Sequence, residues 1–301
     1  MTERQELHLL YRPQNFDEYI GGDALKEAVL SCVDRTRTFL FHGPRGCGKT
    51  SLARLIAAHL KIHESDIHEI DAADKTGIDD ARQIKSSASY APMGGSKKIY
   101  IIDEVHRLSG NAWDSLLKTL EQPPNHCYFV LCTTELSKVP ITIKSRAKSF
   151  EVKPLVRKDA SLLLEWVCEN EQIKLSDPIK NCILDNCEGI PREIIITIDT
   201  VRDIKKDEDA IELIASAKYN PQIIDLCRAL IAKKKWSEIT AILSSIADEP
   251  ESIRYAVLGY MNSVLMKSDN AQAAVVIMCF TESFMYSKKA GLTMACYSSI
   301  H

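Results

Sequence analysis

The chain has 301 residues, of which 45% are hydrophobic and 26% charged, and its formal net charge is −3. This composition is typical of a globular protein with room for two or three domains, without the basic excess that marks many nucleic-acid-binding proteins. The longest apolar run, residues 273–280, is far shorter than the roughly 20 residues of a transmembrane helix, and the first ten residues lack a secretory-signal pattern. We therefore expect a cytoplasmic protein with no membrane partner.

Strands and helices alternate through the first half of the sequence. A helix over 24–34, capped by Asp23, precedes a strand at 38–42, a helix to residue 61 and a strand at 67–71. Next come a helix at 78–89, a strand at 98–102, a helix opened by Ser109 and ended by Pro123 and Pro124, and a final strand at 127–132. This alternation predicts an α/β fold with a parallel sheet.

The strand pattern stops after about residue 153. Helices are predicted near 157–171, 176–187 and 192–204, and the charged stretch 205–209 indicates a boundary. Beyond it, apolar residues recur at helical spacing, as at positions 223, 226, 227 and 230. We expect three domains, an α/β domain over 1–153 and two helical domains over 154–206 and 207–301.

Ten cysteines are scattered along the chain, and none forms a C-x-x-C pair. This pattern favours reduced core thiols over a disulfide framework. His59, His63 and His68 form another cluster of possible metal ligands, but no cysteine lies near them. We interpret them as surface histidines and expect no zinc site.

Residues 43–50 read GPRGCGKT, which fits the G-x-x-x-x-G-K-[ST] pattern of a phosphate-binding loop. Backbone N–H groups of such a loop surround phosphates, Lys49 reaches the terminal phosphates, and the Thr50 hydroxyl is placed for Mg²⁺. A buried strand precedes the loop and a helix follows it, as the motif requires. The predicted nucleotide-binding positions here are Gly43, Pro44, Arg45, Gly46, Cys47, Gly48, Lys49, Thr50 and Ser51, with no separate role for Arg45.

An acidic pair, Asp103 and Glu104, ends the apolar strand at 98–102. Asp103 is expected at the edge of the sheet beside the phosphate loop, where its carboxylate can hold Mg²⁺ through water. Glu104 is the natural base to polarise a water molecule for attack on the terminal phosphorus. Taken alone the pair could cap a helix, but together with the loop it predicts an ATPase site.

Several further segments resemble one family, the DNA polymerase clamp-loader ATPases of the AAA+ class, such as bacterial gamma/tau and the small subunits of replication factor C. The likeness is densest over residues 10–203. It is carried by the segment from Tyr11-Arg12-Pro13 through Ile20-Gly21-Gly22, by DEVHRLS at 103–109, by NAWDSLLKTLEQPP at 111–124 and by LCTTELSKVPITIKSRAKSFEVKPL at 131–155. The resemblance implies an AAA+ domain over 1–153, a helical lid over 154–206 and an oligomerising helical collar over 207–301.

The resemblance also implies roles for individual residues. Tyr11, Arg12, Pro13 and Ile20 belong to the segment that wraps the adenine. Thr134 corresponds to the sensor 1 residue near the terminal phosphate, and Arg192 in Gly189-Ile190-Pro191-Arg192 corresponds to the sensor 2 arginine of the lid. Arg146 corresponds to an arginine finger that acts in trans on a neighbour's ATP, although Ala147 replaces the family's usual cysteine. Without the family, Arg146 and Arg192 would be interpreted as surface arginines.

Two departures from bacterial gamma/tau are informative. That subunit usually carries a four-cysteine zinc module after the phosphate-loop helix, whereas residues 60–67 contain no cysteine. The sequence also lacks the family's long C-terminal extension. Both features favour a compact, phage-type or replication-factor-C-like subunit.

DNA is expected to contact helix N-termini, because these attract phosphates without an excess of lysine. The candidates are Lys75, Thr76, Gly77, Arg107 and Ser109, which could equally be ordinary capping residues. The stretch 87–93 matches the place where the family touches the sliding clamp. Tyr90 and Met93 could be its apolar anchors or could be buried against the sheet.

The resulting hypothesis is an ATPase subunit of a sliding-clamp loader. It would bind ATP and Mg²⁺, join other subunits in a pentameric ring, open the clamp and place it on primer-template DNA. A nonhydrolysing subunit of the same complex would lack Lys49 or the acidic pair, and a DExH helicase needs a second motor domain. A branch-migration motor, which would end in a winged helix, remains the alternative.

Overall fold

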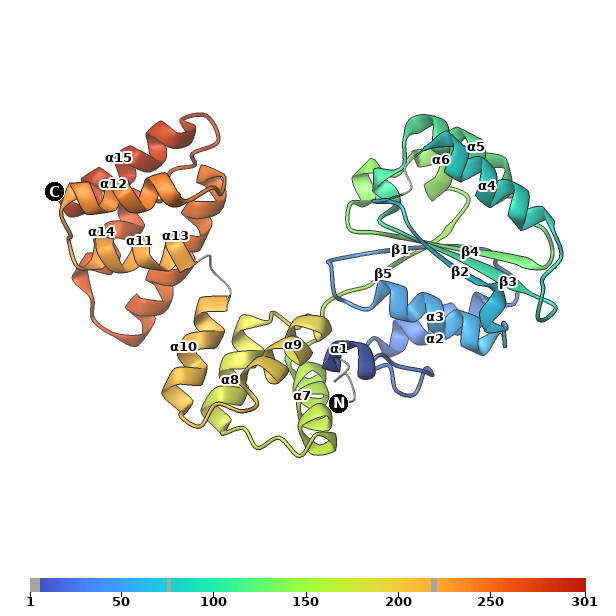
Figure 1. The fold of residues 1–301 in the computed structure, drawn as a ribbon, viewed down its shortest axis with the longest axis horizontal. Coiled ribbons are helices and arrows are strands. Elements are labelled where there is room, and N and C mark those ends of the chain that lie inside the picture. The colour runs from blue at the N-terminus through green and yellow to red at the C-terminus, as the bar shows by residue number, and fades with distance from the viewer. Residues whose placement is uncertain (1–5, 75–76, 218–220) are drawn as a thin grey trace, which may run out of the picture. The chain divides into compact units, whose positions relative to one another are not determined.

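The computed structural model describes residues 6–74, 77–217 and 221–301. The chain divides into two compact units, Met1–Asp203 and Ile204–His301, which are described separately below. The first unit holds a parallel sheet with helices on both faces (Figure 1). Within the described residues, no helix is long and apolar enough to cross a membrane.

The sheet has five strands in the order β2-β3-β4-β1-β5. Four match the sequence prediction: β1 (Thr38–His42), β2 (Ile67–Asp71), β3 (Lys98–Asp103) and β4 (Cys127–Thr133). The expectation that β4 is the final strand is wrong, because β5 (Lys148–Glu151) pairs in parallel with β1. This strand has only four residues and is mostly exposed, so it lacks the apolar run that indicates a buried strand.

Helices cover both faces of this sheet (Figure 1). On one face lie α2 (Asp23–Cys32) and α3 (Lys49–His59), and on the other α4 (Ile78–Ser89), α5 (Gly110–Glu121) and α6 (Ile141–Lys144). Successive strand residues point to opposite faces, so Phe39 and Phe41 of β1 join one core cluster while Leu40 joins the other. Both faces are therefore buried, which explains the nearly continuous apolar sequences of the inner strands.

One predicted helix boundary is wrong. Asp23 is the first residue of α2 rather than its cap; Gly22, in the left-handed conformation with φ +63°, occupies the capping position. The Asp23 carboxylate instead pairs with Lys26 one turn on, at 2.7 Å. An acid in the first turn is favourable next to the helix dipole, so Asp23 still marks the beginning of the helix.

The first unit also contains three helices after the sheet, α7 (Arg157–Asn170), α8 (Asp177–Asn186) and α9 (Pro191–Val201). The short helix α1 (Leu7–Leu10) contacts α9 although it lies at the other end of the unit's sequence. Single-turn helices lie at Glu64–Asp66 (η1), Val105–Arg107 (η2) and Leu136–Lys138 (η3). The last two directly follow the ends of β3 and β4, where they shape the candidate site.

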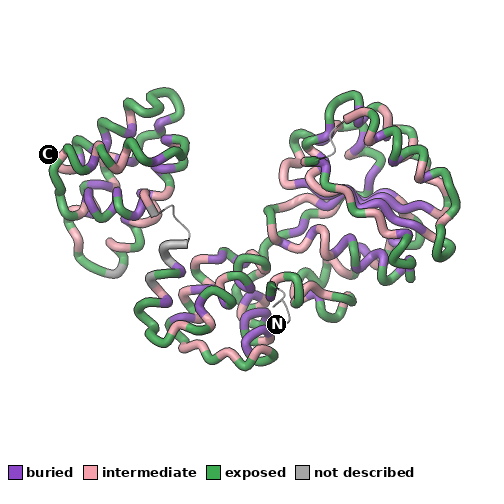
Figure 2. The backbone as a smooth tube through the Cα atoms, viewed as in Figure 1, coloured by how far each residue is buried: buried purple, intermediate pink, exposed green. Residues whose placement is uncertain are grey.

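The second unit is all helical. It comprises α10 (Asp207–Ala217), α11 (Pro221–Ile231), α12 (Trp236–Ser245), α13 (Pro250–Lys267), α14 (Ala271–Cys279) and α15 (Lys288–Ile300). Its core gathers Leu226, Val257, Met261, Val276 and Phe280, all fully buried. Figure 2 shows that buried positions recur along the helices of this unit. The unit thus has its own hydrophobic core, as an independently folding domain requires.

Candidate nucleotide-binding site

A glycine-rich loop joins β1 to α3 at the carboxyl edge of the sheet. Gly43 has φ +149°, and a Cβ atom there would lie 2.1 Å from the carbonyl oxygen of Val152, so no side chain fits. Gly48 has φ +96° and precedes the first residue of α3. The loop can therefore curl with its N–H groups inward next to the helix N-terminus, which is an arrangement that binds phosphate.

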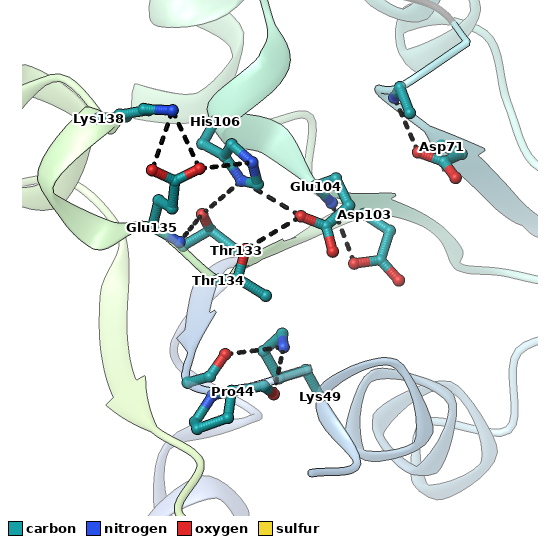
Figure 3. Close-up of polar contacts among 12 residues, drawn as sticks. Pro44, Lys49, Asp71, Asp103, Glu104, His106, Thr133, Thr134, Glu135 and Lys138 are labelled. Atoms are coloured by element: carbon teal, nitrogen blue, oxygen red, sulfur yellow. Dashed lines mark hydrogen bonds and ion pairs between the residues drawn. The ribbon is translucent and has the colours of Figure 1, made fainter. Parts of the chain in front are cut away.

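Lys49 is the buried cation of this loop. The residue is only 5% exposed, and its Nζ donates to the carbonyl oxygens of Gly43 at 2.9 Å and Pro44 at 2.8 Å (Figure 3). An ammonium group has three donors, and both of these acceptors are neutral. A buried positive charge with neutral partners fits a site built to receive an anion, such as the phosphates of a nucleotide.

Thr50 and Asp103 place two oxygen ligands side by side. The Thr50 hydroxyl lies 2.6 Å from Oδ2 of Asp103, although the residues are 53 positions apart in the sequence. Oδ1 of Asp103 accepts the backbone N–H of Glu104 at 3.0 Å, which orients the carboxylate. A hydroxyl and a carboxylate beside a phosphate site are the ligand types that Mg²⁺ takes, so the residues fit this ion.

Glu104 has a strained backbone at the end of β3. It is a non-glycine residue in the left-handed region, with φ +49° and ψ +38°. Its Oε2 lies 3.2 Å from the Thr134 hydroxyl and 3.3 Å from Nδ1 of His106 (Figure 3). Strain of this kind persists where the surrounding structure holds it, and it concentrates at functional sites.

Lys49, Thr50, Asp103 and Glu104 line one cavity of about 320 Å³. Of the sequence-predicted nucleotide residues, the lining includes Tyr11, Arg12, Pro13, Ile20, Arg45, Gly46, Cys47, Gly48, Lys49, Thr50, Ser51 and Arg192, together with Asp103 and Glu104. Gly43 and Pro44 are not among the lining residues, but their carbonyl oxygens accept hydrogen bonds from Nζ of Lys49. Thr134 contacts Glu104 from the end of β4 without lining the cavity.

Several residues that line the cavity were not predicted from the sequence. They are His8, Glu18, Tyr19, Asp71, Leu155, Leu163, Trp166, Pro191 and Ile195. The apolar members Leu155, just before α7, Leu163 and Trp166 of α7, and Ile195 of α9 give the cavity a hydrophobic wall suited to a base. Their spacing cannot be distinguished from that of core positions, because an amphipathic helix shows the same pattern whether it covers a core or a cavity.

Tyr11 links the N-terminal segment to α7. Its hydroxyl donates to Oε1 of Glu171 at 2.9 Å, and its ring meets the Trp166 ring edge-on with centroids 5.0 Å apart. Burial, helped by the carboxylate of Glu171, raises the pKa of the Tyr11 hydroxyl to about 12. Glu171 also pairs with Arg202 at 3.5 Å. The hydroxyl therefore stays a donor near neutral pH.

Arg192 is the second residue of α9 and lies next to the phosphate loop. Its backbone N–H donates to the carbonyl oxygen of Gly46 at 3.4 Å, and its guanidinium lies 3.3 Å from Nε2 of His8. Helix α9 thus contacts the phosphate loop directly, and the arginine lines the cavity.

Comparison with known proteins agrees with this geometry. The sequence profile of the family described as "DNA polymerase III, delta subunit" matches residues 60–156. DNA polymerase III subunit tau of Bacillus subtilis is 34% identical over 254 residues, which is 75% of this chain and 45% of that protein. The tau subunit of Escherichia coli is 30% identical over 292 residues, 87% of this chain and 45% of its own length. The chain belongs to the gamma/tau family of DNA polymerase III subunits.

This gamma/tau-family chain spans less than half the length of the relatives named above. Among solved structures, the RuvB branch-migration motor of Thermotoga maritima aligns with a TM-score of 0.58 at 22% identity, covering 79% of this chain and 87% of that one. A point mutant of the same motor aligns with a TM-score of 0.60 at 20% identity and with the same coverage. This likeness shows that the two share the α/β P-loop fold of AAA+ proteins.

Arg146 lies outside the cavity of its own chain. It follows α6 and is exposed, with its guanidinium 3.1 Å from a carboxylate oxygen of Glu121 and donating at 2.7 Å to the carbonyl oxygen of Thr142. It is not among the residues that line the nucleotide cavity. Any contact it makes with a nucleotide would have to involve another subunit.

The predicted DNA-contact residues are spread over two helix N-termini. Lys75 and Thr76 lie outside the described residues. Gly77 caps α4, and its N–H donates to Asp80 at 3.3 Å. Ser109 caps α5, where its Oγ accepts the N–H of Ala112 at 3.3 Å, and Arg107 is exposed just before it.

The alternative that Tyr90 and Met93 are buried against the sheet is wrong. They are 67% and 87% exposed, in the loop after α4. Asp66, only 1% exposed, holds this loop from beneath by accepting the N–H groups of Met93 at 2.6 Å and Gly94 at 2.7 Å. The buried Asp66 carboxylate therefore holds the backbone of a loop whose Tyr90 and Met93 side chains are exposed.

Proposed function

We propose that this chain is an ATPase subunit of a sliding-clamp loader, which uses ATP to open the clamp and place it on primer-template DNA. The observation that carries the proposal is the convergence of Lys49, the Thr50–Asp103 pair and Glu104 on one cavity in a chain of the gamma/tau family. The names of its relatives support the link to DNA replication.

Residues in and beside the cavity divide the tasks of nucleotide binding and hydrolysis. Lys49 binds the terminal phosphates, and Thr50 and Asp103 hold Mg²⁺, which when bound neutralises charge on the phosphate oxygens. Glu104 accepts a proton from the attacking water, and the Thr134 hydroxyl steadies that carboxylate. The hydrophobic wall of Leu155, Leu163, Trp166 and Ile195 receives the adenine beside Tyr11 and Ile20. Arg192 approaches the phosphates from the lid.

Arg146 is assigned to the ATP of a neighbouring subunit. Arg146 is exposed and is not among the residues that line the cavity of its own chain. Both observations support action in trans, since a guanidinium at an interface can stabilise charge that develops on the transferred phosphoryl group. Hydrolysis then depends on assembly into a ring, which we take to be a pentamer formed with other subunits through the helical unit at 207–301.

The DNA contact is better placed at α5 than at α4. The first turn of α4 carries Asp79 and Asp80, which repel a phosphate, whereas the first turn of α5 contains no acid. Arg107 and Ser109 precede α5, so this N-terminus combines a guanidinium with the N–H groups of a first helical turn. Tyr90 and Met93 are assigned to the sliding clamp because they are the exposed apolar side chains of the loop after α4.

The test is the ATPase rate of the assembled complex, measured alone, with a sliding clamp, with primer-template DNA and with both. We expect the highest rate with both ligands. If a four-way DNA junction raises the ATPase rate and the clamp does not, the proposal is overturned in favour of a branch-migration motor.

A further inference from the structure

His106 is a nearly buried imidazole between two carboxylates, and the roles assigned above do not use it. Its side chain is 7% exposed and lies in η2, directly after the acidic pair. Nδ1 lies 3.3 Å from Oε2 of Glu104 and 3.1 Å from the hydroxyl oxygen of Thr133, and Nε2 lies 3.2 Å from Oε1 of Glu135 (Figure 3). Each ring nitrogen therefore lies beside a carboxylate oxygen, and the imidazole is held between Glu104 and Glu135.

Glu135 is itself well anchored. Its backbone N–H donates to the Thr133 hydroxyl at 3.0 Å, and its carboxylate pairs with Lys138 at 2.9 Å. Thr133 is fully buried at the end of β4. The far nitrogen of the imidazole is thus tied to a group that the end of the strand holds in place.

Glu104 needs an external support of this kind. Its side chain is 25% exposed at the cavity and has several rotatable bonds. Among the described residues, its carboxylate has polar contacts with Thr134 and His106, and both contacts are made by Oε2. Holding that oxygen leaves Oε1 to face a water molecule in the cavity.

We infer that His106, held by Glu135, is a positioning residue that sets the direction of the Glu104 carboxylate for proton abstraction. The inference rests on the proposed role of Glu104 as the base. A misdirected base slows the chemical step by up to about 100-fold, because proton transfer demands hydrogen-bond geometry. Nucleotide binding depends on Lys49 and Thr50, which do not contact His106, so affinity should not change.

Three substitutions of His106 separate positioning from simple packing. The side-chain amide of Asn can present a donor near the position of Nδ1, whereas that of Gln reaches the position of Nε2 and cannot serve Glu104 in the same way. For H106A and H106Q in the assembled complex with clamp and DNA, we expect kcat to fall roughly 10- to 100-fold. H106N should retain a clearly higher kcat than H106Q. KM and the affinity for a fluorescent ATP analogue should stay within about twofold.

Two further variants, together with thermal melting, distinguish a loss of positioning from a loss of folding. Glu135→Gln removes the charged group beside Nε2 of His106 and weakens the exposed ion pair with Lys138. Glu135 is 44% exposed, so the fold should survive, and kcat should still fall severalfold. Glu27→Gln, on the exposed surface of α2, is the matched control and should leave kcat unchanged. Thermal melting of each variant checks folding.

The decisive comparison is made in the E104Q background. If His106 acts through Glu104, H106A should cause no further loss there. The inference would be overturned if H106A lowered kcat in the E104Q background by as much as it does alone. It would also be overturned if the single variants H106A and E135Q both turned over at the wild-type rate. Wild-type turnover by E104Q itself would instead remove Glu104 as the base, which is a separate failure of the proposed function.

Discussion

The hydroxyl of Thr50 lies 2.6 Å from Oδ2 of Asp103, and this contact joins the first turn of α3 to the end of β3. Strand β4 lies between β1 and β3 in the sheet, so the two residues come from non-adjacent strand–helix units. The contact shows that the phosphate loop and the acidic pair are already aligned in the chain as folded. Mg²⁺ would bind at this junction and complete the site rather than assemble it.

Lys49→Ala and Glu104→Gln should separate nucleotide binding from turnover. Removing Lys49 deletes the buried cation that faces the phosphates and should weaken ATP binding by about 2 kcal/mol or more, which is about 30-fold in Kd. Glu104→Gln keeps the cavity and should bind ATP normally while kcat falls by roughly 10²- to 10⁴-fold. Titration with a fluorescent ATP analogue and steady-state hydrolysis measure the two effects. Equal affinities and equal residual rates for both variants would contradict the assigned roles.

Arg146→Ala should suppress hydrolysis in the assembled complex without affecting ATP binding by its own chain. The expected loss is roughly 10³-fold or more, as for other arginine fingers. Folding should not suffer, because the partner carboxylate of Glu121 is 46% exposed and an exposed ion pair contributes at most about 1 kcal/mol. Arg35→Ala is the matched control, since Arg35 is also exposed and also donates to a carbonyl oxygen four residues back.

Complementation tests whether Arg146 acts in trans. In a mixture of Arg146→Ala and Lys49→Ala chains, some interfaces combine an intact loop from one chain with an intact arginine from the other. Hydrolysis should recover in such mixtures above the sum of the separate variants. Wild-type turnover by a ring built entirely from Arg146→Ala chains would leave this residue an ordinary surface arginine.

Changing both Tyr90 and Met93 to Asp should weaken clamp binding only. Both side chains are exposed, so the new charges stay in water and neither the fold nor basal hydrolysis should change. Clamp affinity by surface plasmon resonance, basal turnover and thermal melting measure the three properties. Ser96→Asp adds a charge to the same exposed loop and serves as the control. A drop in the melting temperature of the double variant would mean that the two residues support the core.

Asp66→Asn should lower the stability of the first unit in a pH-dependent way. Burial raises the pKa of the Asp66 carboxyl, but the N–H groups of Met93 and Gly94, together with nearby His68 and Lys98, lower it more, so the net pKa lies below its ordinary value. The ionised group therefore stabilises the fold at pH values above about 4, the pKa of an unfolded Asp. This contribution is lost as pH falls through about 4 towards the lowered folded pKa.

At pH 7 we expect Asp66→Asn to cost on the order of 2 kcal/mol, because one of two N–H groups loses its acceptor. The difference from the wild type should shrink as pH falls below about 4. Unfolding can be followed by the fluorescence of Trp113 and Trp166 in a Trp236→Phe background, which reports on the first unit alone. The exposed Asp17 provides the control, Asp17→Asn. A stability difference that stays constant from pH 7 to pH 3.5 would contradict the role of the charge.

Local sequence patterns located much of the fold and of the site. The bounds predicted for the strands at 38–42 and 67–71 and for the helix at 78–89 are those that the structure has. Local signals favour two of them: residues 39–41 form an apolar run that ends just before Gly43, and the helix begins directly after Gly77. The phosphate loop and the acidic pair were recognisable for a similar reason, since their chemistry depends on residues that are close together in the sequence.

Long-range contacts decided the rest. Tyr11 binds Glu171 across 160 positions, and Asp66 supports a loop 27 and 28 residues away, neither of which leaves a local signal. Strand β5 was not predicted from the sequence, because its pairing with β1, rather than its own apolar content, makes it a strand. The position of His106 between Glu104 and Glu135 likewise depends on β3 and β4 being neighbours. Periodicity and motifs reveal which residues carry the chemistry, whereas only the packing of strands and helices settles which side chains hold them in place.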